Sequence, residues 1–83
     1  MPVSTRSDMC RLLAVRSQDA FPPAPYLEKF ASIAKNSKEF QGHGWGCAWL
    51  DPAGLWQIYR NIRPVWEHDF SPFPSTTLLV AHA

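Results

Sequence analysis

The chain has 83 residues, enough for one small domain with a modest core. Its net charge of +1 gives no electrostatic reason to expect a nucleic-acid or acidic-membrane partner, and no apolar run reaches the roughly 20 residues that a membrane helix needs. Two cysteines make no disulfide framework, and residues 1–9 (MPVSTRSDM) lack the apolar centre of a secretory signal, so a cytoplasmic setting is expected.

The first half of the chain predicts a strand, an extended proline segment and a helix. Residues 1–9 are polar and expected to lack fixed structure. Cys10 to Arg16 is a short apolar run with charged flanks, and its length favours a strand. The prolines of FPPAP (21–25) force an extended approach, after which a helix follows and fades near Asn36. The apolar stripe of this helix is expected in the core and comprises Tyr26, Phe30, Ile33 and Ala34.

A hairpin is predicted in the middle of the chain. HGWGCAWL (43–50) reads as a strand, DPAG (51–54) as a turn, and LWQIYRNI (55–62) as a half-buried strand. The apolar face of the second strand carries Trp56, Ile58 and Ile62, with Arg60 as its odd member.

The end of the sequence predicts a surface connection and a buried strand. Residues 63–74 hold three prolines and should cross over the surface. STTLLVAHA (75–83) is β-branched and apolar, which is typical of a central strand covered on both faces. Because the pattern stops within the strand, we expect the chain to be the front part of a larger domain.

Cys10 directly follows an internal methionine, Met9, and two interpretations of it are open. A cysteine at the start of a core strand is often simple packing. A thiol whose own residue carries a free α-amino group would instead have a built-in general base, because that amine has a pKa near 8. This second interpretation requires that residues 1–9 are removed.

The other candidate groups favour plain structural interpretations. Cys47 alternates with Trp45 and Trp49 and is expected to be a buried thiol, although a bond to Cys10 stays open. A zinc site from Cys10, His43 and His82 would lack compact ligand spacing, so we expect no metal, and no cofactor motif is present. The cluster Glu67-His68-Asp69 lies in the proline-rich segment and is expected to be solvated.

Four segments in order resemble the opening of the class II glutamine amidotransferases, which are N-terminal-nucleophile enzymes. They are MCRLLAV, GHGWGCAWL, RPVWEHDF and TLLVAHA, and the stand-alone branch of the family is the most similar. The resemblance implies an α+β fold, the first helix and strands of a four-layer αββα sandwich. It also implies that residues 10–83 form the N-terminal part of a type 2 amidotransferase domain and that residues 1–9 are a leader absent from the mature protein.

The resemblance assigns roles to individual residues. Cys10 matches the nucleophile that attacks the side-chain amide of glutamine, releases ammonia and forms a γ-glutamyl thioester that water hydrolyses. Gly44, Trp45 and Gly46 match the glycine-containing strand beside the nucleophile, where a side chain would crowd either the neighbouring strand or the bound substrate. His82 matches the histidine of the family's Ala-His-x-Arg strand. The implied partners are glutamine or a γ-glutamyl amide, and a synthase domain or subunit that accepts ammonia.

The sequence also departs from the family pattern. His43 stands where the family often has aspartate, and the substrate-gripping arginine and the oxyanion residues of the family are not found in this chain. Loss of an oxyanion donor costs about 100- to 1000-fold in rate, so the segment alone is expected to be inactive. A γ-glutamyl amide hydrolase acting on a small thiol compound and a non-catalytic remnant or binding module of the same fold stay open as alternatives.

Overall fold

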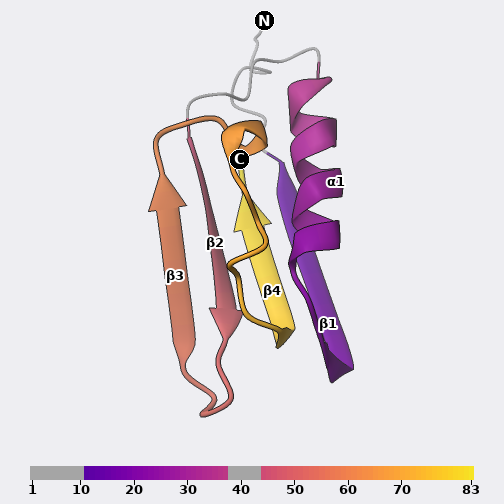
Figure 1. The fold of residues 1–83 in the computed structure, drawn as a ribbon, viewed down its shortest axis with the longest axis vertical. Helices are drawn as coiled ribbons and strands as arrows, with labels where there is room; N and C mark the ends of the chain where they lie inside the picture. The colour runs from indigo at the N-terminus through magenta and orange to yellow at the C-terminus, as the bar shows by residue number, and fades with distance from the viewer. Residues whose placement is uncertain (1–10, 38–43) are drawn as a thin grey trace, which may run out of the picture.

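The computed structural model describes residues 11–37 and 44–83, which form an α+β fold (Figure 1). Its four-stranded sheet is antiparallel throughout and has the order β1-β4-β2-β3. The elements in chain order are β1 (Leu12–Phe21), α1 (Ala24–Lys35), β2 (Trp45–Leu50), β3 (Trp56–Asn61), the short 3-10 helix η2 (Val65–Glu67) and β4 (Thr76–His82). Among these described residues, no helix is long and apolar enough to cross a membrane.

The two faces of the sheet have different surroundings. Helix α1 and the segment from β3 to β4 cover one side, here called the inner face, whose paired residues are Leu13, Val15, Trp45, Cys47, Trp49, Gln57, Tyr59, Asn61, Leu79 and Ala81. The opposite side, the outer face, carries Leu12, Ala14, Arg16, Gly46, Ala48, Leu50, Trp56, Ile58, Arg60, Leu78, Val80 and His82. The single core therefore lies between the inner face and its cover.

The helix forms where the sequence predicts it, but the side of the helix that is buried differs from the predicted one. It begins after Pro23, and Asn36 closes its end by donating from Nδ2 to the Ser32 carbonyl at 2.9 Å. The buried residues are Leu27, Phe30, Ala31 and Ala34. The prediction that Tyr26 and Ile33 lie in the core was wrong, since they are 42% and 47% exposed. The cause is position, because α1 lies along β1, the edge strand, and one of its sides overhangs that edge (Figure 1).

The predicted hairpin of β2 and β3 is confirmed, and Asp51 organises its turn. The Asp51 carboxylate accepts the backbone N–H groups of Ala53 and Leu55 and the Gln57 side-chain amide, each at 2.9 Å. These bonds, first that from Leu55 and then that from Gln57, lower the pKa of Asp51. Gly54 completes the turn with a φ of 82°, a conformation that glycine adopts without steric cost.

Strand β3 turns its apolar side to solvent, contrary to the prediction of a half-buried apolar face. Trp56 and Ile58 lie on the outer face and are 50% and 70% exposed. Tyr59 faces inward and packs against Phe73, with ring centroids 5.4 Å apart. The segment from β3 to β4 brings that phenylalanine over the inner face, so the alternation of β3 is correct and its direction of burial is reversed.

Strands β1 and β4 also differ in detail from their predictions. β1 continues beyond Arg16 to Phe21, with a register irregularity between these two residues and an exposed polar stretch there. β4 is central, as predicted, but it is covered on one face only. Leu79 is fully buried on the inner face, whereas Val80 on the outer face is 37% exposed.

Candidate functional site

The predicted nucleophile, Cys10, lies outside the described residues. The next residue, Arg11, is described and is paired with Ala83 at the end of β4. Arg11 N–H donates to the Ala83 carbonyl at 2.9 Å, and Ala83 N–H donates to the Arg11 carbonyl at 3.0 Å. The chain therefore enters the sheet beside the segment that carries His82.

Two of the predicted substrate-binding residues face each other across neighbouring strands. His82 of β4 is paired with Gly46 of β2, and both lie on the outer face. The same row continues to Leu12 of β1 on one side and to Arg60 of β3 on the other. This row, Leu12–His82–Gly46–Arg60, is called the outer row below, and it brings sequence segments far apart in the chain to one end of the sheet.

The close approach of β3 calls for glycine at positions 44 and 46. Gly44 has a φ of 128°, and a Cβ at this position would lie 3.0 Å from the Asn61 carbonyl oxygen. A Cβ on Gly46 would lie 3.1 Å from Arg60 Cγ and 3.2 Å from the Tyr59 carbonyl oxygen. Side chains here would crowd the neighbouring strand, which is one of the two reasons for glycine that the sequence suggested.

Trp45 does not share the surface of Gly46 and His82. Its side chain is 4% exposed and lies on the inner face. The indole ring packs edge-on against Phe70 and His68, with centroids 5.6 Å and 5.2 Å away. A ligand on the outer row could therefore reach Trp45 only through its backbone.

His68 was expected to be solvated, but it is half-buried and contacts Trp45 and Pro64. Its Nδ1 lies 3.0 Å from the Pro64 carbonyl oxygen, and Trp45 Nε1 lies 3.3 Å from its Nε2. The same indole nitrogen also lies 3.2 Å from Nδ1 of the ring. The spacing of WEHDF carried no signal for this contact, which depends on how residues 63–75 cross the sheet.

The neighbours of His68 serve separate local contacts. Glu67 pairs with Arg63, with Arg63 Nη2 at 3.2 Å from Glu67 Oε1. Asp69 accepts the backbone N–H and the hydroxyl of Ser71, each at 3.0 Å, and the backbone bond first of all lowers the pKa of Asp69. The three consecutive polar residues thus point to different partners and do not form one catalytic arrangement.

Cys47 is a buried thiol, as predicted. It lies on the inner face at 4% exposure, and burial raises the pKa of its thiol to about 11. A thiol held in the protonated form is a poor nucleophile. Of the three zinc ligands considered, Cys10 and His43 lie outside the described residues. Within the described ranges no group of three His, Cys, Asp or Glu side chains could hold a metal ion.

The paired residues of the outer face include basic side chains and no acidic ones. Arg16, Arg60 and His82 lie on it, and its paired residues include no aspartate or glutamate. Between these groups the face is apolar. A ligand bound at the outer row would therefore meet the Arg60 guanidinium beside the backbone of Gly46, which suits a carboxylate.

Comparison of the chain with protein-family models, with curated protein sequences and with solved structures gives no match. The functional proposal therefore rests on the sequence pattern and on the geometry of the sheet.

Proposed function

We propose that this chain supplies the nucleophile-bearing part of an amide-hydrolysing domain similar to that of the class II glutamine amidotransferases. The observation that supports this most directly is the pairing of Gly46 with His82, at the end of the sheet where Arg11 enters it. Three of the four segments that carry the family resemblance thereby meet in space. Nothing in their sequence spacing requires that they do so.

The proposed reaction uses Cys10 as the first residue of the mature protein. Its α-amine takes the thiol proton, and the sulfur attacks the γ-carbonyl carbon of glutamine or a γ-glutamyl amide. The carbon–nitrogen bond breaks, and the protonated amine returns a proton to the leaving ammonia. Water then attacks the γ-glutamyl thioester, so that glutamate is released and the thiol is restored.

The charge of the outer row supports a γ-glutamyl substrate. Such a substrate carries an α-carboxylate at a distance from the amide that reacts. Arg60 and His82 offer hydrogen-bond donors on the same face as Gly46. We assign these two residues to substrate binding, on either side of the Gly46 backbone.

The open outer face supports the layered architecture of the same proposal. Apolar side chains of β1, β3 and β4 are exposed there, among them Leu12 and Ile58 at 79% and 70%. A second sheet packed on this face would bury them and, with α1 outside the first sheet, would give three of the four layers of an αββα sandwich. Ammonia formed between the sheets would pass to a synthase domain or subunit, in a cytoplasmic setting.

Labelling with a glutamine analogue tests this proposal. The native protein is treated with 6-diazo-5-oxo-L-norleucine, which alkylates a thiol at a glutamine site, and the modified residue and the mature N-terminus are identified by mass spectrometry. We expect the label on Cys10 of a chain that begins at that residue, and no label after Cys10→Ser. The matched variant Cys47→Ser should label normally.

Two results would contradict the proposal. The first is a fully active protein that retains residues 1–9, because the α-amine of Cys10 would then be blocked. The second is a label that disappears equally in both cysteine variants, or one that maps to Cys47. A protein that binds glutamine reversibly without labelling at Cys10 would instead be the non-catalytic binding module.

A further inference from the structure

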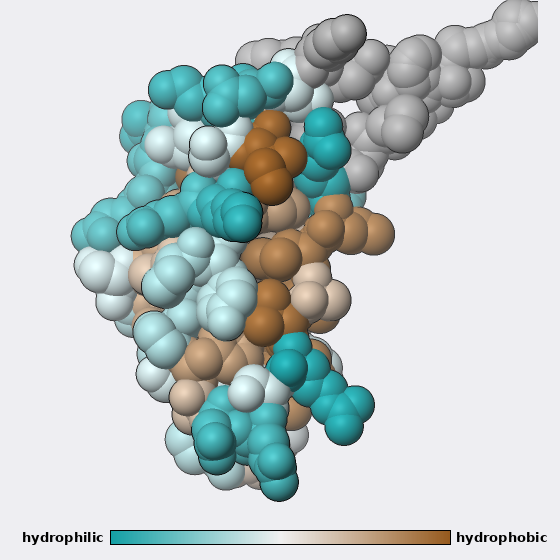
Figure 2. All heavy atoms as spheres, turned by 90° about the vertical axis from the view of Figure 1, so that its right-hand side faces the viewer, coloured by the Kyte–Doolittle hydropathy of each residue, from teal (hydrophilic) through white to brown (hydrophobic). Residues whose placement is uncertain are grey.

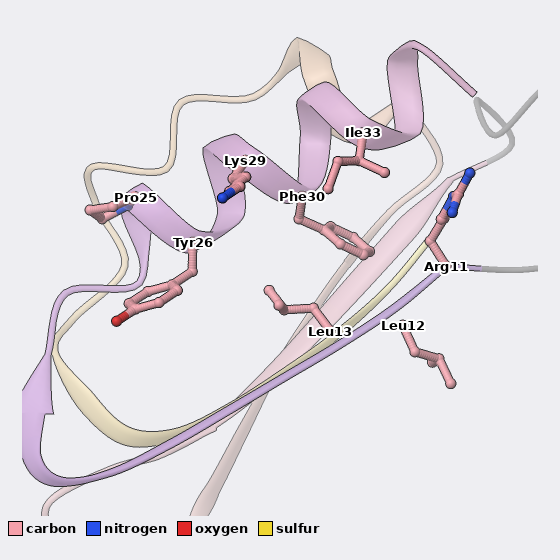
Figure 3. A pocket seen from close by; sticks show the side chains of 8 residues that line it. All are labelled: Arg11, Leu12, Leu13, Pro25, Tyr26, Lys29, Phe30 and Ile33. Carbon is pink, nitrogen blue, oxygen red and sulfur yellow. The ribbon is translucent and has the colours of Figure 1, made fainter.

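A groove runs between α1 and the edge strand β1, and of the outer row only Leu12 lines it. It encloses about 560 Å³ and is lined by Arg11, Leu12, Leu13, Pro25, Tyr26, Lys29, Phe30 and Ile33. Figure 2 shows an apolar band along this edge of the molecule, bordered by hydrophilic residues. Figure 3 shows the side chains of Tyr26 and Phe30 projecting from the helix toward β1, with Leu13 below the ring of Phe30.

The hydrogen-bonding groups of β1 alternate between the sheet and this open edge. Arg11 and Ala83 exchange both backbone hydrogen bonds, so they form a hydrogen-bonded pair. In an antiparallel ladder the next pair, Leu12 with His82, is then of the non-hydrogen-bonded kind. The backbone N–H and C=O groups of Leu12 and Ala14 therefore point away from β4, toward the edge where no described strand is paired.

The helix side of the groove offers apolar surface to anything added at that edge. Tyr26 and Ile33 are half exposed there, next to the buried ring of Phe30. Side chains alternate along a strand, so every second side chain of an added strand would point into the groove. Main-chain pairing with β1 and side-chain burial against α1 would thus occur together, as in peptide recognition by strand addition.

The charges of the groove define the chemistry of its occupant. Arg11 and Lys29 line it, and none of the described residues adds an acidic side chain to its lining. Arg11 donates from Nη2 to the Ser37 hydroxyl at 3.2 Å, a neutral partner, and the described residues give its guanidinium no ion pair. An occupant with a carboxylate near these two groups would gain charge-assisted hydrogen bonds.

We propose that the groove binds an extended segment of another polypeptide as an added strand antiparallel to β1. Its alternate apolar side chains pack against α1, and a carboxylate at its C-terminal end lies beside Arg11, where β1 begins. A second copy of this chain is less suitable. Its β1, in antiparallel alignment, would lead Pro22 and Pro23 toward this end of the groove, and prolines have no N–H to donate to the ladder. This proposal is independent of the chemistry of Cys10.

Binding of designed peptides tests the proposal. The probe is a short fluorescein-labelled peptide of alternating valine and threonine that ends in glutamate with a free carboxyl group. The matched peptide ends in glutamine with an amidated terminus. Fluorescence anisotropy with the full chain should show that the acidic peptide binds roughly tenfold more tightly, since both added anions lie near Arg11 and Lys29.

Two pairs of variants identify the groove. Ala14→Pro removes an outward N–H without removing a bond to β4, and should abolish binding, whereas Ala14→Val keeps that N–H and should bind normally. Lys29→Glu should lower the affinity for the acidic peptide about fivefold. Lys35→Glu changes a residue of the same helix that lies outside the groove, and should leave that affinity unchanged. Circular dichroism melts establish that each variant is folded, and if Ala14→Pro is not, the two lysine variants decide.

Equal binding of the two peptides, or equal effects of Lys29→Glu and Lys35→Glu, would overturn the proposal. So would a dimer in size-exclusion chromatography that Ala14→Pro converts to a monomer, because the edge would then belong to a second copy. Slowed hydrogen exchange of the Leu12 and Ala14 amides by the acidic peptide alone would confirm strand addition at β1.

Discussion

Gly46 and His82 lie directly opposite each other on β2 and β4, so an imidazole faces a residue without a side chain. In the proposed function, a ligand held by the histidine lies beside this glycine. We expect His82→Ala to change the free energy of unfolding by less than about 0.5 kcal/mol, because the residue is exposed. The same variant should slow labelling of Cys10 by the glutamine analogue at least about tenfold.

Gly46→Val tests whether position 46 must lack a side chain. Valine would meet Arg60 Cγ and the Tyr59 carbonyl and should cost about 1–3 kcal/mol of stability as well as labelling. Urea unfolding and labelling rates measure the two effects separately. If His82→Ala labels at the normal rate, the histidine is not a substrate-binding residue.

Gly44 and Gly54 should respond differently to alanine, although both have positive φ. At Gly44 the new methyl group would also lie 3.0 Å from a backbone oxygen of β3, whereas at Gly54 nothing lies within 4 Å. We expect Gly44→Ala to cost about 2–4 kcal/mol and Gly54→Ala about 1–2 kcal/mol. Equal shifts of the urea midpoint would mean that the conformation alone, and not the contact with β3, requires glycine at position 44.

Titration of the Cys47 thiol should make the chain less stable at high pH. Burial raises its pKa from 9.0 to about 11, so the folded state holds the proton more tightly than the unfolded state does. The contribution is complete below pH 9 and is lost as the pH rises from about 9 to 11, by at most roughly 3 kcal/mol. Thermal melts across this range, with Cys47→Ala as control, measure it. The control should show a smaller loss, and equal losses would exclude this thiol as the cause.

The exposed outer face should make the isolated 83-residue chain prone to aggregate. Ile58 lies on that face, and Tyr59 is the next residue on the inner face. Ile58→Lys should therefore increase the monomer fraction in size-exclusion chromatography, while Tyr59→Lys should unfold the chain. A wild-type chain that is monomeric and melts cooperatively would show that this face needs no cover.

Local patterns predicted the elements but not which way they face. The helix, the Asp51 turn and the hairpin follow from short-range rules that depend on neighbouring residues. The burial of β3 does not, because alternation defines two faces and only the crossing of residues 63–75 decides which one is covered. Tyr26 and Ile33 are exposed for a similar reason, since α1 lies over an edge strand that the sequence does not identify as one.

The candidate site was only partly predictable. Gly44, Gly46 and His82 were assigned to substrate binding through a family resemblance. The structure places Gly46 opposite His82. Trp45 shares the motif but lies in the core, since adjacent strand residues point to opposite faces. His68 gave no sequence signal, because its contacts with Trp45 and Pro64 depend on the path of the chain between β3 and β4.

The position of β4 between β1 and β2 affects the order in which the sheet can assemble during synthesis. The β2–β3 hairpin has its own turn and can pair as soon as both strands leave the ribosome. β1 is made earlier, yet its only described partner strand is β4, the last element in this order. Until then β1 and α1 have no sheet to pack on, and long-range pairing of this kind is slow. A nascent chain is therefore expected to hold two unjoined pieces, and chaperone binding should end when residues 76–82 emerge.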